Sequence, residues 1–348
     1  MIHDHATASL KGVIIPQNLS VSTMASTVPN ALLLASLSDL STPHFLSPVI
    51  ITAASSAQKR LVIALYSPLF TSPNDDVTEP PISHTERWDD VQRLLTFVYV
   101  QATKAAQEMD KVLLEVDVLL KGTNEGIPDF AVETDVVFRV QGDILAPPLS
   151  SLVPQHYGAP DTEAELHHQP LPPSAQNVSY PPMYPVTALG GTFDHLHAGH
   201  KILLSMGAWI SSEKLIVGVT GDELLKNKAY KEVLEDIQTR KDRVRKFLTL
   251  FKPGLFYDIV VISDVYGPTG WDPYIQALVV SAETMSGAKA ITSHRASQSL
   301  SALEIFVIDV ISPTSSKLDH EDHELLKQTK MSSTFIREWI SKQVAGDD

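Results

Sequence analysis

The stretch best suited to chemistry runs from Ala188 to His200 and reads Ala-Leu-Gly-Gly-Thr-Phe-Asp-His-Leu-His-Ala-Gly-His. A mostly apolar run, Val186–Leu189, ends at a double glycine, and an amphipathic run follows His200. The pattern predicts a strand, a tight turn and a helix. Glycines let backbone N–H groups approach a ligand closely, and a helix N-terminus favours anions. His197 and His200 lie on one side of the first helical turn, so the residues predict a phosphate site with two imidazole donors.

The spacing resembles the nucleotidyltransferase superfamily of the HxGH type, whose fingerprint is a Gly-x-Phe-Asp turn followed by His-x-Gly-His. Every residue of that fingerprint is present: Gly191, Phe193, Asp194, His197, Gly199 and His200. The family couples it with a C-terminal Ser-Ser-Thr-x-x-Arg motif, which residues 332–337 match. Considered without the first motif, Ser332–Thr334 would be the N-cap of a helix over Phe335–Val344, and we expect that role as well. A capped helix start exposes the backbone donors that would hold phosphates.

Most of the 13 histidines lack such a context. Nine are assigned to the surface or to a satisfied core position by residue habit: His3, His5, His44, His84, His156, His167, His168, His320 and His323. His195 and His294 lie beside motif residues and stay undecided. No histidine and carboxylate set has the spacing of metal ligands, so we predict no protein metal site.

Composition limits the class of protein. A chain of 348 residues favours about two domains, and 43% apolar residues indicate an ordinary soluble globular protein. No apolar stretch is long enough to span a membrane, and the first residues resemble neither a secretory signal nor a mitochondrial presequence. The absence of cysteine excludes disulfides and thiolate catalysis and fits a cytoplasmic protein. A net charge of −14 argues against nucleic-acid binding. A dense cationic stretch, residues 226–245, is expected to be mostly a solvated helix face.

A proline-rich segment from about Leu145 to Pro185 favours extended backbone that builds no ladder. We therefore predict an N-terminal α/β domain over residues 1–145, a linker over 146–183 and a nucleotidyltransferase domain over 184–348. In the last domain, apolar runs alternate with helical patterns and predict a Rossmann-like parallel sheet covered on both faces. The expected strands are Val186–Leu189, Leu215–Val219, Tyr257–Ile262, Ala277–Ser281 and Ile305–Ile311, with helix over most of Asp222–Phe251.

The secondary structure of the smaller N-terminal domain is harder to predict. Leu61–Tyr66, Val112–Leu120 and Asp135–Val140 predict strands, and apolar residues from Trp88 to Ala102 recur at helical spacing. No residues suited to chemistry are evident there. We expect the fragment from about Tyr180 onward to fold and act alone.

A further series resembles phosphopantetheine adenylyltransferase of the eukaryotic and archaeal type. It consists of Gly267–Asp272, Val279–Thr284, Gly287, Ala288, Ile291, Arg295 and Leu303–Ile305. Because no Walker A motif is present, we expect no fused dephospho-coenzyme A kinase, and the layout is similar to that of the fungal monofunctional enzyme. The resemblance implies adenylyl transfer from ATP to 4′-phosphopantetheine in coenzyme A biosynthesis.

The resemblance also implies roles for individual residues. The catalytic set would be His197, His200 and Lys228. ATP would be held by Gly190, Gly191, Phe193, His200, Glu283, Arg295, Ser332, Ser333, Thr334 and Arg337. Phosphopantetheine would be held by Thr192, Asp194 and Lys226. Mg²⁺ should bind through ATP oxygens rather than through a protein cage.

Two alternatives stay open. The chain could be another member of the superfamily, a cytidylyltransferase or a nicotinamide mononucleotide adenylyltransferase, because the histidine motif does not discriminate between them. It could also be a scaffold subunit that binds other coenzyme A pathway enzymes through the N-terminal domain.

Overall fold

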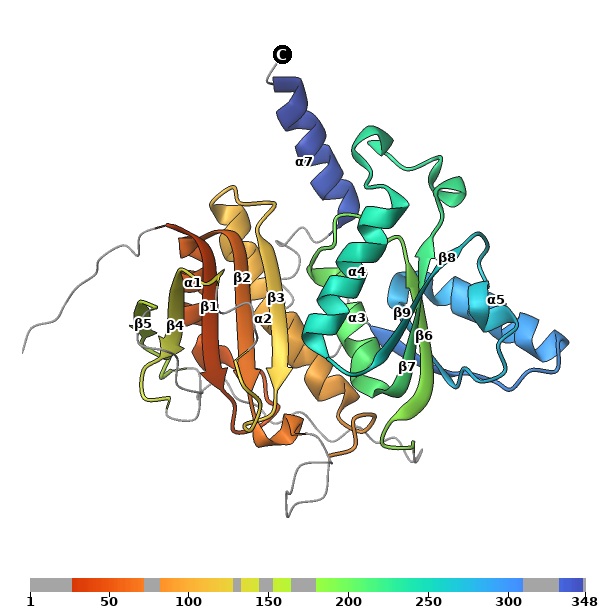
Figure 1. Cartoon of the computed structure of the whole chain (residues 1–348), viewed down its shortest axis with the longest axis horizontal. Helices are drawn as coiled ribbons and strands as arrows, with labels where there is room; N and C mark the ends of the chain where they lie inside the picture. Colours follow the sequence, from red (N-terminus) through yellow and green to blue (C-terminus); the bar gives the residue numbers. More distant parts are fainter. Residues whose placement is uncertain are drawn as a thin grey trace, which may run out of the picture.

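The chain forms two parallel five-stranded sheets with helices packed on them (Figure 1). This computed structural model describes residues 27–71, 82–127, 133–143, 153–163, 180–308 and 332–346. The N-terminal sheet has the strand order β3-β2-β1-β4-β5. Its strands are β1 (Val28–Ser36), β2 (Ala57–Tyr66), β3 (Glu115–Lys121), β4 (Val136–Val140) and β5 (Gln155–Gly158).

The C-terminal sheet has the order β10-β9-β6-β7-β8. Its strands are β6 (Tyr184–Gly191), β7 (Ser211–Thr220), β8 (Phe256–Ile262), β9 (Ala277–Ser281) and β10 (Glu304–Ile308). All pairings in both sheets are parallel. The predicted fold class, a Rossmann-like domain beside an N-terminal α/β domain, is confirmed.

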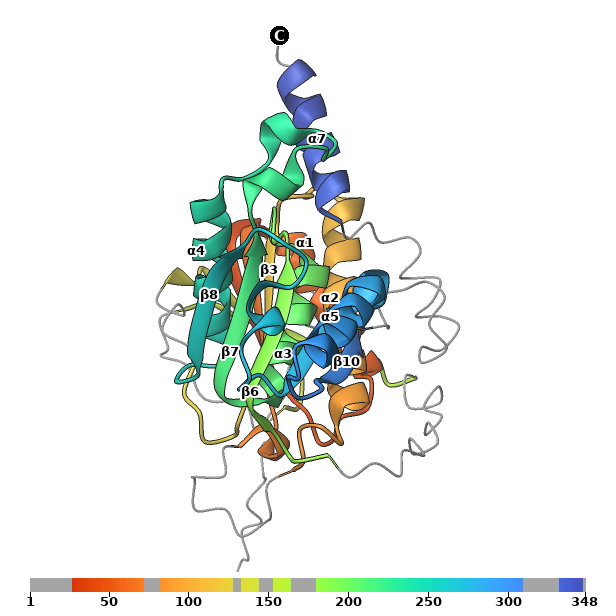
Figure 2. The ribbon, with the colours of Figure 1, turned by 90° about the vertical axis from the view of Figure 1, so that its right-hand side faces the viewer.

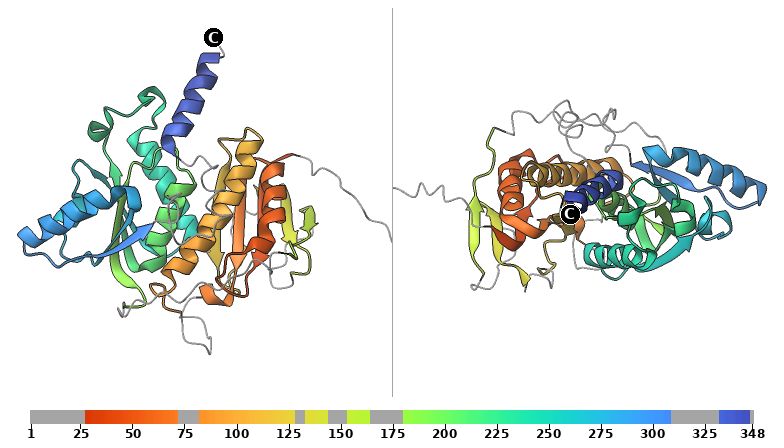
Figure 3. Two further views of the ribbon diagram at one scale, coloured as in Figure 1. Left: turned by 180° about the vertical axis from the view of Figure 1, so that it is seen from behind. Right: turned by 90° about the horizontal axis from the view of Figure 1, so that it is seen from above.

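Helices of both halves meet between the two sheets. The helices are α1 (Ser47–Ser56), α2 (Trp88–Glu108), α3 (Ala198–Ile210), α4 (Ile237–Phe251), α5 (Met285–Ser297) and α7 (Ser333–Gly346). Helix α2 packs on α3, and α3 packs on α4 (Figures 1 and 3). Helix α5 covers the opposite face of the C-terminal sheet, and α7 rises beside the loops that follow β7 (Figure 2).

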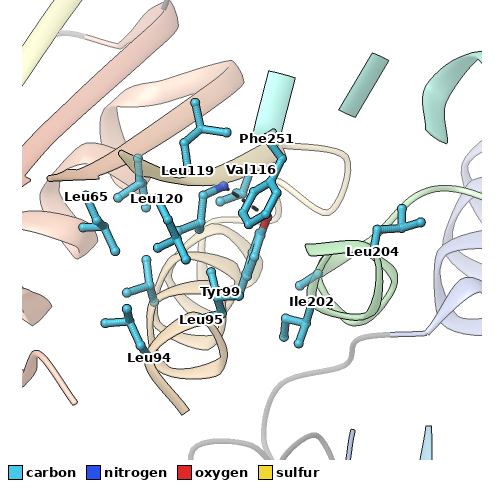
Figure 4. Close-up of a cluster of buried hydrophobic side chains, with 14 of the residues drawn as sticks. Leu65, Leu94, Leu95, Tyr99, Val116, Leu119, Leu120, Ile202, Leu204 and Phe251 are labelled. Atoms are coloured by element: carbon cyan, nitrogen blue, oxygen red, sulfur yellow. Dashed lines mark hydrogen bonds between the residues drawn. The ribbon is translucent and has the colours of Figure 1, made fainter. Parts of the chain in front are cut away.

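Alternation along the strands divides the core of the C-terminal sheet between its two faces. Leu189, Val217 and Val279 join the large core that continues into the N-terminal half, whereas their neighbours Ala188 and Ile216 face α5. In the large core, Leu95 and Tyr99 of α2 lie near Ile202 of α3 and Phe251 of α4 (Figure 4). The two halves therefore share one continuous apolar interior.

The structure differs from the sequence-based expectations in three places. β1 was not predicted, because its buried run, Ala31–Ala35, is apolar at every position and lacks the alternation that signals a strand. β5 lies inside the predicted linker and pairs with β4, so the expectation of no ladder there is wrong over these residues. A short strand at the sheet edge tolerates flanking prolines such as Pro154 and Pro160. Asp222–Asp236 holds only short 3₁₀ turns, and the α-helix begins at Ile237.

Candidate active site

The turn after β6 is open to an anion. Phe193 and His195 adopt left-handed backbone conformations, with φ of 52° and 44°, and such strain clusters at functional sites. Within the described residues, the N–H groups of Thr192, Phe193 and Asp194 donate to no protein acceptor. The turn therefore presents several unused backbone donors at the carboxyl end of the central strand.

The two motif histidines form a stacked pair at the start of α3. His197 is the N-cap residue and makes no side-chain cap hydrogen bond. The His197 and His200 ring centroids lie 3.9 Å apart, with 24° between the ring planes. Both Nδ1 atoms are buried and lack a partner in the described part of the chain, which leaves Nε2 of each largely buried ring for a ligand.

Both imidazoles are neutral at pH 7 in the free protein. Burial lowers the pKa of His197 to about 3, with further contributions from Lys201 and His195. Burial also holds the pKa of His200 well below its ordinary value, and the nearby His197 and Lys228 add to the effect. A bound polyphosphate would oppose burial and raise the pKa of both rings, because an anion favours the protonated ring.

The second motif meets the first through α7. Ser333 Oγ donates to the backbone carbonyl of Asp194 over 2.8 Å, and Arg337 Nη1 pairs with Asp194 Oδ2 at 2.5 Å. Ser332 Oγ accepts from the N–H of Phe335, as expected of an N-cap, and Thr334 of the same motif is exposed. Two motifs far apart in the sequence therefore share one carboxylate.

Asp194 and Arg337 are both buried by this contact. Asp194 Oδ1 accepts from the N–H of Glu235, so both carboxylate oxygens are occupied. Arg337 Nε also donates to the carbonyl of Ala229. A direct contact of Asp194 with phosphopantetheine, or of Arg337 with ATP, would require breaking this pair. Their geometry instead supports a role in joining the turn to α7.

The predicted lysines lie on the exposed loop between β7 and α4. The charge of Lys228 contributes, after burial and His197, to the lowered pKa of His200, so this lysine acts on the histidine pair. Lys226 belongs to the same loop and is exposed.

Among the described residues, no hydrogen bond or ion pair joins Glu283 or Arg295 to the histidine turn, which we define as residues 191–200. Glu283 is exposed in the turn that follows β9, at the same sheet edge as the histidine turn. Arg295 is 1% exposed, and its guanidinium donates to the carbonyls of Thr269, Asp272 and Ser301. The burial of Arg295 therefore argues against the expected direct contact with ATP. Its hydrogen bonds instead support a role in holding the loop of residues 267–272.

The comparisons with known proteins agree with this geometry. Residues 188–339 match the family described as cytidylyltransferase-like. The phosphopantetheine adenylyltransferase of Pyrobaculum aerophilum is 34% identical over 44% of this chain and 90% of its own length. This chain belongs to the cytidylyltransferase-like family and is homologous to phosphopantetheine adenylyltransferases.

For two fungal relatives, the alignment with this chain covers a smaller share of the relative's length than it does for the Pyrobaculum protein. The phosphopantetheine adenylyltransferase of Saccharomyces cerevisiae is 52% identical over 36% of this chain and 41% of its own length. An uncharacterized protein of Schizosaccharomyces pombe is 43% identical over 53% of this chain and 58% of its own length. The alignments thus span about half the length of these two relatives.

The sequence analysis missed one residue that supports the site of this nucleotidyltransferase. Arg240 was counted in the cationic stretch expected to be mostly a solvated helix face, but it is fully buried. Its guanidinium donates to the carbonyls of Thr192, Thr220 and Glu235, and pairs with Asp222 at 2.6 Å. The signal was its spacing: Arg240 falls on the buried stripe of α4 with Val244, Phe247 and Phe251.

Carboxylates near the histidine turn are occupied by protein partners. Besides Asp194, Glu235 accepts from the N–H of His195 and pairs with Arg243. Across the described part of the chain, no group of three or more potential metal ligands comes together. His167, His168, His320 and His323 lie outside the described residues. None of the described helices has both the length and the apolar character needed to cross a bilayer.

Proposed function

We propose that this nucleotidyltransferase transfers the adenylyl group of ATP to 4′-phosphopantetheine, giving dephospho-coenzyme A and pyrophosphate. The observation that carries the proposal is the meeting of both phosphate motifs at Asp194, beside unused backbone donors and a histidine pair. The printed names of the Saccharomyces and Pyrobaculum relatives support the choice of acceptor.

In this reaction a phosphate oxygen of phosphopantetheine attacks the α-phosphorus of ATP, and the bond from that phosphorus to the pyrophosphate oxygen breaks. The nucleophile is already anionic at pH 7, so no strong base is required. Catalysis then depends on positioning and on neutralising charge at the equatorial and leaving oxygens.

The residues divide that work. Thr192 holds the acceptor phosphate, whereas the backbone from Gly190 to Phe193 and the exposed start of α7 at Ser332–Thr334 meet the phosphates of ATP. His197 and His200 donate to phosphate oxygens, and Lys228 bridges the two substrates, with Lys226 on the same loop. Arg337 and Asp194 keep α7 against the turn.

The donor set around the turn also limits where Mg²⁺ fits. Asp194 and Glu235 are engaged by protein donors, and the histidines face a polyphosphate site. Mg²⁺ would therefore be held by ATP oxygens, where it supplies charge neutralisation, rather than by these carboxylates.

A pyrophosphate-release assay tests the proposal. Purified protein would be given ATP or CTP in the presence of Mg²⁺, with 4′-phosphopantetheine or nicotinamide mononucleotide as acceptor. We expect turnover with ATP and 4′-phosphopantetheine, and loss of turnover in His197→Asn and His200→Asn variants. Turnover with CTP alone, or with nicotinamide mononucleotide alone, would reject the substrate assignment and keep the family. No turnover with any pair would favour a scaffold role.

A further inference from the structure

The turn that carries both histidines is attached to the N-terminal sheet by the next residue of α3, Lys201. This lysine is 2% exposed. Its Nζ donates to the carbonyl of Val116 over 2.8 Å and to Asp117 Oδ1 over 2.6 Å. Both acceptors belong to β3, so a buried ammonium of one half is held by the other half.

Asp117 is shared between two cations. Its Oδ2 accepts from Arg60 of β2 through Nε at 3.0 Å and Nη2 at 2.7 Å. Burial raises the pKa of the Asp117 carboxyl, but Lys201 and Arg60 outweigh burial and hold that pKa below its ordinary value. Asp117 is therefore ionised at neutral pH and connects α3 to two strands of the N-terminal sheet.

The pair of Lys201 with Asp117 restrains the histidine turn directly. The N–H of Lys201 donates to the carbonyl of His197 over 3.0 Å, which closes the first turn of α3. His200 precedes Lys201 directly and stacks on His197. Fixing the Lys201 side chain thus fixes the rotation of this turn about the helix axis.

A buried ion pair of this kind adds little net stability, because desolvation offsets most of the attraction. Its geometric effect is larger, because a displacement of about 1 Å at a reacting group can cost on the order of 10²-fold in rate. The ammonium also contributes, after burial, to the low pKa of His197.

We propose that Lys201 is a positioning residue, through which Asp117 of the N-terminal domain holds the histidine turn in its reactive orientation. The proposal rests on the proposed function for its activity assay. It gives the N-terminal half a role in the transfer reaction without a catalytic residue of its own. It also reverses the expectation for the fragment from Tyr180 onward, in which Lys201 would be left without Asp117.

The test compares two variants that each remove one cation from Asp117. Lys201→Met detaches α3 and leaves Asp117 paired with Arg60, whereas Arg60→Met leaves the pair of Lys201 with Asp117 in place. Both are studied as full-length protein with ATP and 4′-phosphopantetheine. We expect Lys201→Met to lower kcat about 10-fold or more with the KM for ATP within about twofold, and Arg60→Met to keep kcat within about twofold.

A second readout does not depend on the substrates. The pKa of His197, followed by NMR in the free protein, should rise toward its ordinary value in Lys201→Met, because a cation that opposes protonation is gone. It should stay unchanged in Arg60→Met. Lys201→Gln replaces Lys201→Met if that variant fails to fold.

Equal losses of kcat in both variants, or an unchanged His197 pKa together with full activity of Lys201→Met, would overturn the positioning role. If wild-type protein does not use 4′-phosphopantetheine, the proposed function fails, and an unchanged His197 pKa in Lys201→Met would by itself overturn the positioning role.

Discussion

The two sheets have the same strand order and the same parallel pairing, yet among the described residues only one has unused backbone donors at the end of its central strand. At the end of β1, the N–H of Ser36 donates to Asp143 Oδ2 over 2.7 Å, and the N–H of Leu37 donates to the carbonyl of Tyr66. At the corresponding end of β6, the N–H groups of Thr192 and Phe193 have no protein acceptor among the described residues. We therefore expect an anion site at the crevice of the switch point only where the backbone donors stay unused.

The two carboxyl edges also face opposite ends of the molecule. The first turn of α3, at the carboxyl edge of the C-terminal sheet, contacts Val116 at the start of β3. The last turn of α3 contacts the segment before α2, because Trp209 Nε1 donates to the carbonyl of His84. The N-terminal sheet therefore offers its amino edge to the site, which suits an anchor rather than a second phosphate pocket.

The strongest test of this contrast removes one imidazole from each half of the protein. His200→Ala should lower kcat by about 10²–10³, because one donor to the transition state is lost. The matched change His156→Ala, on β5 of the other sheet, should leave kcat within about twofold. Steady-state pyrophosphate release measures both. Near wild-type turnover in His200→Ala would make that ring a structural residue.

Breaking the link between the two motifs should have the next largest effect. Arg337→Ala leaves the buried Asp194 carboxylate without its cation, and we expect a loss of about 3–5 kcal/mol in unfolding free energy together with reduced kcat. Adding Asp194→Asn should recover part of that stability. Urea unfolding measures the first effect. A raised KM for ATP with unchanged stability would show instead that Arg337 contacts the nucleotide directly.

The two glycines that end β6 give a matched pair. A Cβ at residue 191 would lie 3.0 Å from the Phe193 ring, whereas one at residue 190 would meet its nearest atom at 3.6 Å. Gly191→Ala should therefore shift the turn and lower kcat several-fold. Gly190→Ala makes no such close contact, so it should mainly raise the KM for the acceptor by restricting access to the end of β6. If the KM for the acceptor and kcat respond identically in both, the Phe193 contact has no special role.

Acid should destabilise the C-terminal half through its buried neutral histidines. The pKa of His197 is about 3 in the fold and about 6.5 when unfolded, so the unfolded state binds the proton more tightly. The stability from this group is complete above about pH 6.5 and is lost as the pH falls toward 3. Urea unfolding at pH 7.5, 6 and 5 should show this slope. A His197→Asn variant with the same slope would assign it to other groups.

The smallest effect on activity is expected at the closed strand end. Asp143→Ala frees the N–H of Ser36 and should cost about 1–3 kcal/mol in stability, as for an unsatisfied donor. Transfer activity should stay within about twofold, because the change lies in the other sheet. A loss of kcat larger than the loss in Gly191→Ala would show that the N-terminal edge takes part in the reaction.

Local pattern by itself determined the strand, glycine turn and histidine helix, the alternation of the C-terminal sheet and the cap at Ser332. These features depend on periodicity and on residues a few positions apart, so they can be interpreted without knowing what packs on them. The same kind of pattern misjudged β1 and β5. Full burial removes alternation from a central strand, and prolines can flank a short edge strand.

Only the tertiary structure decided what the charged side chains do. Arg240, Lys201, Asp194 and Arg337 carry ordinary surface residue types, and each is buried against a partner far away in the sequence. Whether a charge is solvated or buried depends on that partner, because an unpaired buried ion is too costly to persist. The two motifs could be identified from the sequence. That Asp194 joins them and that Lys201 attaches the first of them to the other half could be determined only from the folded chain.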